Sequence, residues 1–220
     1  MGELMKYKLL CLFTFVICLY TIGIVNAKDF PLIGKVIYID PGHGGVDPGA
    51  VYEGIYESNI NLEISIKLQE ELERKGAIVY LTRYGDYDLA VKNALLRKRS
   101  DLSRRANIIN KSDCDLYLSI HLNADSSSTW KGAQVFYDDV NKNNELLAKI
   151  LQEQLLKDLN TNREYKRLND QYMYKRINIT GALVEVGFIS NPNERYLLQK
   201  GEYQNKIAES ITKGIIEYFN

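Results

Sequence analysis

From residue 35 onward the sequence alternates short apolar segments with longer amphipathic ones, and this alternation restricts the chain to few folds. The short segments are rich in β-branched and aromatic residues, which is typical of buried strands. The longer segments repeat apolar residues every three to four positions, which predicts helices. We therefore expect an α/β single domain with a central mixed, mostly parallel twisted sheet flanked by helices on both faces. The predicted strands are 35–39, 77–82, 115–120, 132–137 and 182–188, and the predicted helices are 57–75, 102–111, 146–155 and 207–218.

The first 27 residues differ in character from the rest. Lys6 and Lys8 precede an almost unbroken apolar run over residues 9–25, and Val-Asn-Ala follows at 25–27. A positive start, an apolar run and small residues at a cleavage position are the pattern of an export signal. The run is also just long enough to approach the width of a bilayer, so an uncleaved N-terminal membrane anchor is the alternative. Either way the sequence predicts export across the cytoplasmic membrane.

Residues 28–220 contain no linker rich in proline, glycine or serine and no internal repeat, which predicts one domain. The 220-residue chain has 28 basic and 28 acidic residues, so no overall positive field indicates nucleic acid or anionic lipid as a partner. Beyond the export signal the only cysteine is Cys114, which excludes an internal disulfide framework. The domain must therefore depend on its apolar core, and we expect Cys114 to be a buried, inert thiol.

The chain has two histidines, His43 and His121, and each follows the end of a predicted strand. Functional groups of open α/β sheets gather at such ends. Three glycines at 42, 44 and 45 leave no Cβ beside His43, so backbone or ligand can approach closely. Neutral imidazole is the usual nitrogen ligand of zinc, which favours a metal site over a packed histidine or a plain tight turn.

Two glutamates complete a candidate hydrolytic site. A catalytic zinc usually takes three protein ligands, and Glu57 at the start of a predicted helix is a candidate third ligand. The alternative is that Glu57 only stabilises the helix dipole. Glu185 lies inside the apolar strand 182–188, where burial would raise its pKa as a general base requires. The alternative for Glu185 is the exposed face of an edge strand.

Six motifs in a fixed order resemble the zinc-dependent N-acetylmuramoyl-L-alanine amidases of the Amidase_3 type. They are IDPGHGGVDPGA at 39–50, Glu57 before Asn61-Leu62, LTR at 81–83, LSRRANIIN at 102–110, DLYLSIHLNA at 115–124 and LVEVGFISN at 183–191. The resemblance implies that His43, Glu57 and His121 bind one Zn²⁺ and that Glu185 is the catalytic base. It implies a zinc amidase domain over 28–220 that cleaves the peptidoglycan amide between the lactyl group of muramic acid and L-alanine.

Other residues match the family less closely. Asp47, Arg105 and Asn123 are candidates for supporting the site or contacting substrate. Ser58 stands where many members have lysine, which could change the surroundings of the metal. Ile109 replaces a common alanine, and Thr180-Gly181 stands where a proline is common.

The short, signal-bearing, single-domain organisation is similar to that of the germination-specific amidases of spore formers, which act on the spore cortex so that muramic lactam can form. The expected location is then the cell wall or the space around the forespore, with an accessory or activating protein as partner. A general autolysin, a zinc peptidase acting within the stem peptide and a catalytically silent wall-binding protein are the alternatives. A basic, aromatic stretch at 157–176 could line a groove for anionic glycan and peptide.

Overall fold

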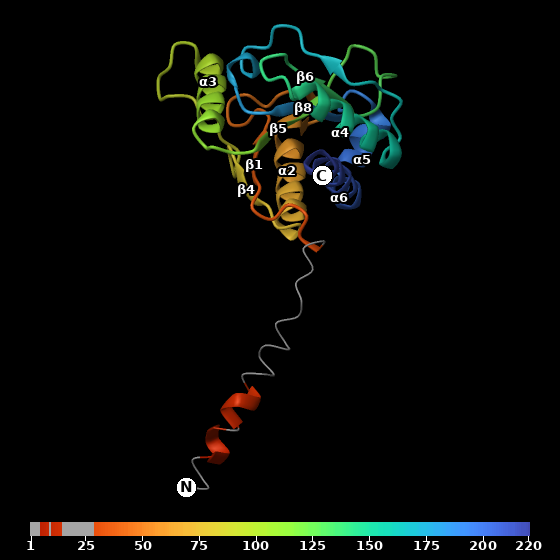
Figure 1. The fold of residues 1–220 in the computed structure, drawn as a ribbon. Helices are drawn as coiled ribbons and strands as arrows, with labels where there is room; N and C mark the ends of the chain where they lie inside the picture. Colours follow the sequence, from red (N-terminus) through yellow and green to blue (C-terminus); the bar gives the residue numbers. More distant parts are fainter. Residues whose placement is uncertain (1–4, 9, 15–28) are drawn as a thin grey trace. The chain divides into compact units, whose positions relative to one another are not determined.

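The computed structural model describes residues 5–8, 10–14 and 29–220 (Figure 1). Residues 5–8 and 10–14 are helical and exposed. Most of the predicted export signal, including its cleavage position at 27, lies outside the described residues. Among the residues that are described, no helix combines the length and the apolar character needed to cross a membrane. Residues 32–220 form one compact unit.

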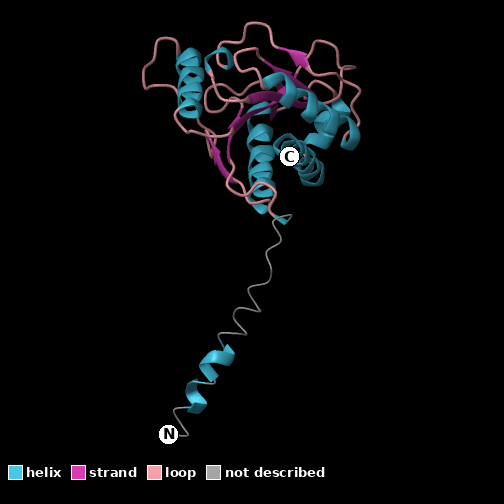
Figure 2. Ribbon diagram, in the orientation of Figure 1, coloured by secondary structure: helices cyan, strands magenta, loops and turns pink. Residues whose placement is uncertain are grey.

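A six-stranded sheet runs through this unit in the order β4-β1-β5-β8-β6-β7 (Figure 2). Its strands are β1 (Val36–Pro41), β4 (Ile78–Leu81), β5 (Leu116–Asn123), β6 (Gln134–Tyr137), β7 (Lys166–Arg167) and β8 (Gly181–Phe188). All neighbouring pairs are parallel except β6 and β8, which are antiparallel. The prediction of a mixed, mostly parallel sheet is therefore confirmed. A separate two-stranded hairpin joins β2 (Val51–Tyr52) to β3 (Ile55–Tyr56).

Helices cover both faces of the sheet, as predicted. The larger core cluster includes buried residues of α2 (Glu57–Arg74), α4 (Asn144–Asp158) and α6 (Gly201–Phe219). A smaller cluster joins α3 (Arg97–Asn110) and the short 3-10 helix η2 (Tyr174–Arg176) to the sheet. Figure 1 shows α2 beside α6, with α3 on another side of the sheet.

The buried stripes of the helices follow the predicted period. Ile64, Leu68 and Leu72 lie four residues apart along α2 and are fully buried, since this spacing returns side chains to one face. Helix α2 ends where Gly76 takes a left-handed φ of 92°, as expected for a glycine that terminates a helix. Cys114 is buried, which confirms the sequence prediction.

Three helices differ from the sequence prediction, one of them α6, which starts six residues before the predicted 207. Helix α3 starts at Arg97, five residues early, because its first turn is polar and shows no apolar period. The short helix α5 (Pro192–Leu198) was not predicted, although its signals were present. Pro192 opens it, and the side chain of Asn191 accepts hydrogen bonds from the backbone N–H groups of Asn193 and Glu194, which caps the helix.

The central strands also correct two expectations about the candidate residues. Strand β5 continues to Asn123, so His121 lies within the strand and not after its end. Strand β8 lies between β5 and β6, so the edge-strand alternative for Glu185 is wrong. His121 and Glu185 are register partners on the adjacent parallel strands β5 and β8. The sheet itself therefore places these two side chains next to each other.

Candidate active site

His43 lies in a tight turn that follows β1. Its φ of 61° is left-handed, and Gly44 and Gly45 also take positive φ values of 122° and 63°. The turn is closed by hydrogen bonds between the backbone groups of Gly44 and Asp47, at 2.8 and 3.2 Å. A Cβ at Gly42 would overlap the ring of His121. Glycine at this position therefore lets the turn lie directly against the second histidine.

Glu57, the first residue of α2, joins the two histidines. Its Oε1 lies 3.2 Å from Nε2 of His43 and 3.1 Å from Nδ1 of His121. The same carboxylate accepts backbone hydrogen bonds from Ala50 at 2.9 Å and from Leu122 at 3.1 Å. Because each carboxylate oxygen accepts a backbone hydrogen bond, the buried side chain of Glu57 is held in one orientation. Glu57 thus points at the histidines from the start of the helix.

The three side chains form a group that can hold a metal ion. One ligand atom from each of His43, Glu57 and His121 lies within 4.8 Å of the other two. Two imidazoles and one carboxylate are a donor set that suits a catalytic divalent metal. Burial acts to raise the pKa of Glu57, but the hydrogen bonds and charges of His121 and His43 hold it well below its usual range. The carboxylate is therefore ionised, as a metal ligand has to be.

Glu185 faces this group from β8. Its Oε2 is buried and has no hydrogen-bond partner among the described residues. Burial raises the pKa of Glu185 to about 7, helped by the charge of Glu57 and opposed by His121 and His43. A carboxyl group that titrates near neutral pH can both accept and return a proton. The unpartnered oxygen is free to take that role.

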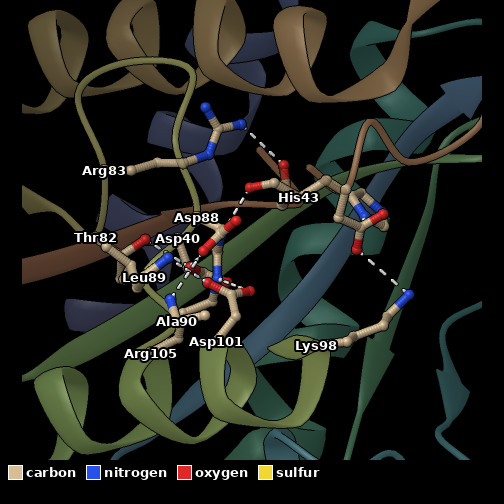
Figure 3. Close-up of polar contacts among 12 residues, drawn as sticks. Asp40, His43, Thr82, Arg83, Asp88, Leu89, Ala90, Lys98, Asp101 and Arg105 are labelled. Carbon is tan, nitrogen blue, oxygen red and sulfur yellow. Dashed lines mark hydrogen bonds and ion pairs between the residues drawn. The ribbon is translucent and has the colours of Figure 1, made fainter. Parts of the chain in front are cut away.

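Arg105 supports the turn that carries His43. Its guanidinium donates to the backbone carbonyls of Pro41 at 2.8 Å and His43 at 2.6 Å. It also pairs with the carboxylates of Asp40 at 2.8 Å and Asp101 at 2.9 Å. Figure 3 shows these side chains gathered between the turn and α3. Arg105 thus lies beside the site and contacts both backbone carbonyls and two carboxylates.

Of the other two candidates, Asp47 contacts His43, whereas Asn123 does not line the cavity. Asp47 places its Oδ2 3.0 Å from Nδ1 of His43, which orients the imidazole so that Nε2 faces Glu57. The same oxygen lies 3.3 Å from Nζ of Lys98. Asn123 lies past an irregularity in β5 and is not part of the pocket wall.

Arg83 is a buried residue near the site that the sequence reasoning did not single out. It donates to the carbonyl oxygens of Pro41 and Gly42, each at 2.9 Å, and of Ser58 at 2.7 Å. One guanidinium thus ties the turn of His43 to the first turn of α2, which carries Glu57. Burial and the nearby Arg105 lower the pKa of Arg83 to about 10. The sequence signal for Arg83 was the LTR motif at 81–83, which gives the residue type but not the groups that the side chain contacts.

The site opens into a cavity of about 230 Å³. His43, His121 and Glu185 line one part of it, and residues 171, 173 and 174 line another. A group of residues able to hold a metal and an unpartnered carboxyl group beside one open cavity are parts that amide hydrolysis can use.

The fold and the site therefore define a hydrolytic enzyme built on a mixed α/β sheet, with a group of residues able to hold a metal. The sequence matches the Amidase_3 family, described as N-acetylmuramoyl-L-alanine amidase, over residues 37–217. The chain belongs to this family of N-acetylmuramoyl-L-alanine amidases, which confirms the fold, family and enzyme class predicted from the motifs.

Three similar proteins illustrate the match. The germination-specific N-acetylmuramoyl-L-alanine amidase of Bacillus subtilis is 47% identical over 195 residues, which cover 87% of this chain and 82% of the relative. The amidase LytC of the same organism is 31% identical, over 89% of this chain and only 38% of its own length. The solved CwlD amidase from Clostridioides difficile, in complex with the GerS lipoprotein, has 40% identity and a TM-score of 0.80. That match covers 84% of this chain and 98% of the CwlD chain.

Proposed function

We propose that residues 28–220 form an exported zinc amidase domain in which His43, Glu57 and His121 hold one Zn²⁺ and Glu185 is the catalytic base. The substrate is peptidoglycan, and the bond cleaved joins the lactyl group of muramic acid to L-alanine. The observation that carries the proposal is the convergence of three ligand atoms beside an unpartnered carboxyl oxygen. Two imidazoles and a carboxylate leave a fourth position for water or substrate, which is the arrangement of catalytic zinc.

The residues divide the chemistry between them. A bound zinc ion supplies a Lewis acid for the scissile carbonyl and lowers the pKa of water. Glu185 takes a proton from the attacking water through Oε2 and delivers it to the nitrogen of L-alanine, which leaves as a neutral amine. Asp47 holds His43 in the orientation that ligation needs. Arg105 and Arg83 keep the turn of His43 in place while the proton moves.

The biological setting follows from the relatives. The similarity to a germination-specific amidase over most of both chains supports a role in maturation of the spore cortex and in germination. This role places the protein outside the cytoplasmic membrane, around the forespore. The CwlD amidase was solved with a lipoprotein, which supports an accessory protein for this chain as well. A general autolysin role is favoured less, because LytC is less similar to this chain.

The test uses the protein with zinc, purified sacculi and mass spectrometry of the released fragments. We expect stem peptides with a free L-alanine amine. Glu185→Gln should reduce the rate by about 10²- to 10⁴-fold, as expected for loss of a general base, and should retain zinc. The control is Glu63→Gln, which changes a glutamate of α2 that contacts Gln204 outside the cavity wall.

Three outcomes would contradict parts of the proposal. Cleavage elsewhere in the stem peptide would identify a zinc peptidase. Binding to sacculi without turnover in the parent protein would identify a silent wall-binding protein. Equal activity of Glu185→Gln and Glu63→Gln would remove Glu185 from the mechanism.

A further inference from the structure

A second cavity lies beside the active-site cavity, on the N-terminal part of α3. It has a volume of about 450 Å³ and is lined by Leu96, Arg97, Lys98, Arg99, Leu102 and Tyr172. Lys98 and Leu102 line both cavities. The neighbours of Tyr172 in the chain, Gln171 and Met173, line the active-site cavity. The two cavities therefore adjoin, and a ligand cleaved in the first can extend into the second.

The floor of this second cavity is a tyrosine ring contacted by two arginines. The guanidinium of Arg176 lies 3.6 Å from the ring centroid of Tyr172, and that of Arg99 lies 4.8 Å from it. The Tyr172 hydroxyl is 2.9 Å from Oγ of Ser103, and the Tyr172 carbonyl accepts from Arg176 at 2.6 Å. Stacking on an aromatic face holds a guanidinium in a defined orientation. Arg99, Tyr172 and Arg176 are called the arginine platform below.

The charges of the platform are not neutralised by the protein. Arg97 pairs with Asp88 and Lys98 pairs with Asp47, so these two cations of the cavity wall have carboxylate partners. No ion pair joins Arg99 or Arg176 to a carboxylate within the described ranges, 5–8, 10–14 and 29–220. Two positive charges beside one ring create a local positive potential, which attracts an anion.

The rest of the basic stretch at 157–176 has other contacts. Arg163 stacks on Trp130 and Phe188, and Lys175 pairs with Asp170. Arg167 and Lys175 line a further cavity of about 260 Å³. Tyr172 is the member of the stretch that lines the second cavity, and Arg176 contacts its ring.

We propose that the arginine platform binds a carboxylate on the peptide arm of the substrate, while the scissile amide lies in the adjoining cavity. The inference rests on the proposed function and adds a specificity site to it. A planar guanidinium can hold a carboxylate through paired hydrogen bonds, which a neutral amide cannot match. The apolar side chains of Leu96 and Leu102 contact the non-polar part of the peptide. Acidic stem peptides are then better substrates than amidated ones.

The test compares two muramoyl-peptides that differ only in one group, a free or an amidated carboxyl on the residue after L-alanine. The variant is Arg99→Gln with Arg176→Gln. Its charge-matched control is Arg104→Gln with Lys111→Gln, which removes two exposed charges at α3 outside both cavities. On the free-carboxyl peptide we expect the platform variant to raise KM by about tenfold with kcat unchanged, because only binding is lost. On the amidated peptide its KM should equal that of the parent.

Other outcomes would overturn the proposal. An unchanged KM on the acidic peptide would show that the platform does not contact substrate. An equal rise on both peptides, or the same rise in the control variant, would show a general charge or folding effect. Failure of the proposed function is distinguishable, because the parent protein would then cleave neither peptide at the muramoyl amide.

Discussion

Gly49 provides a test of how closely the chain packs around the proposed metal ligands. Its φ of 69° is left-handed, and a Cβ added there would lie 2.6 Å from Oε2 of Glu57 and 2.7 Å from Cδ2 of His43. The Cβ of Glu57 would also be only 2.9 Å away, so rotation of the carboxylate cannot relieve the overlap. Carbon atoms pack at about 3.5 to 4 Å, so Gly49→Ala has to displace a ligand by roughly 0.8 Å.

A matched control separates this displacement from backbone strain. Gly54 has a similar φ of 76°, and a Cβ there would meet no heavy atom within 4 Å. Both alanine variants should lose about 1 to 2 kcal/mol of unfolding free energy to backbone strain, because alanine is strained in the left-handed region, and Gly49→Ala should lose more through the overlap. Urea unfolding of the zinc-free proteins measures this shared cost.

The two variants should differ in zinc binding and catalysis. We expect Gly49→Ala to lose about 10- to 100-fold in zinc affinity, as for other changes that move a ligand, and about 10²-fold in kcat/KM. Gly54→Ala should match the parent in both. Competition with a chromophoric chelator measures the affinity. Zinc affinities of the two variants within twofold of each other would refute the reasoning.

Three further predictions concern the buried charges and the metal. Arg83→Lys should lower zinc affinity by about tenfold in the same competition assay, because lysine cannot tie both ligand-bearing turns together. Burial acts to raise the pKa of Asp40, but contacts with Arg105, Thr82 and Ser119 outweigh this effect and lower the pKa. The ionised Asp40 therefore stabilises the fold above the unfolded pKa of about 3.9, and this stabilisation is lost as pH falls through the lower folded pKa. Asp40→Asn should therefore cost about 3 to 5 kcal/mol at pH 7 and flatten the acid limb of stability, measured by urea unfolding from pH 7 to pH 2. Removal of zinc by a chelator should abolish turnover and lower the thermal midpoint, and added zinc at about 100 times its Kd should restore about 2.7 kcal/mol.

Much of the fold could be predicted from periodicity, because buried strands and amphipathic helices each leave a local pattern in the sequence. The stripe of Ile64, Leu68 and Leu72 is an example that the structure confirms. The charged first turn of α3 left no such pattern, and its start was placed too late. The two-residue strands β2, β3 and β7 were missed, because segments so short have no period to read.

The candidate site could be predicted in part. Residue type and strand position pointed to His43 and His121, and the structure brings both to Glu57. Spacing alone did not decide whether Glu57 is a metal ligand, since a glutamate at a helix start also stabilises the helix dipole. The contacts of Arg83 could not be predicted, because it bonds carbonyl oxygens 41 and 25 residues away that only the folded sheet brings near. Catalytic and ligand roles of these residues remain predictions that the variants above test.

The register of β5 and β8 has an evolutionary consequence. His121 and Glu185 are opposite each other on adjacent parallel strands, so their separation is set by backbone hydrogen bonding and not by any loop. Loops around the cavity, including the segment that carries Tyr172, can then lengthen, shorten or change charge without altering the spacing between the proposed ligand His121 and the proposed base Glu185. Descendants of one ancestral enzyme could thus acquire new substrate preferences by loop variation alone, while the strands preserve the reaction.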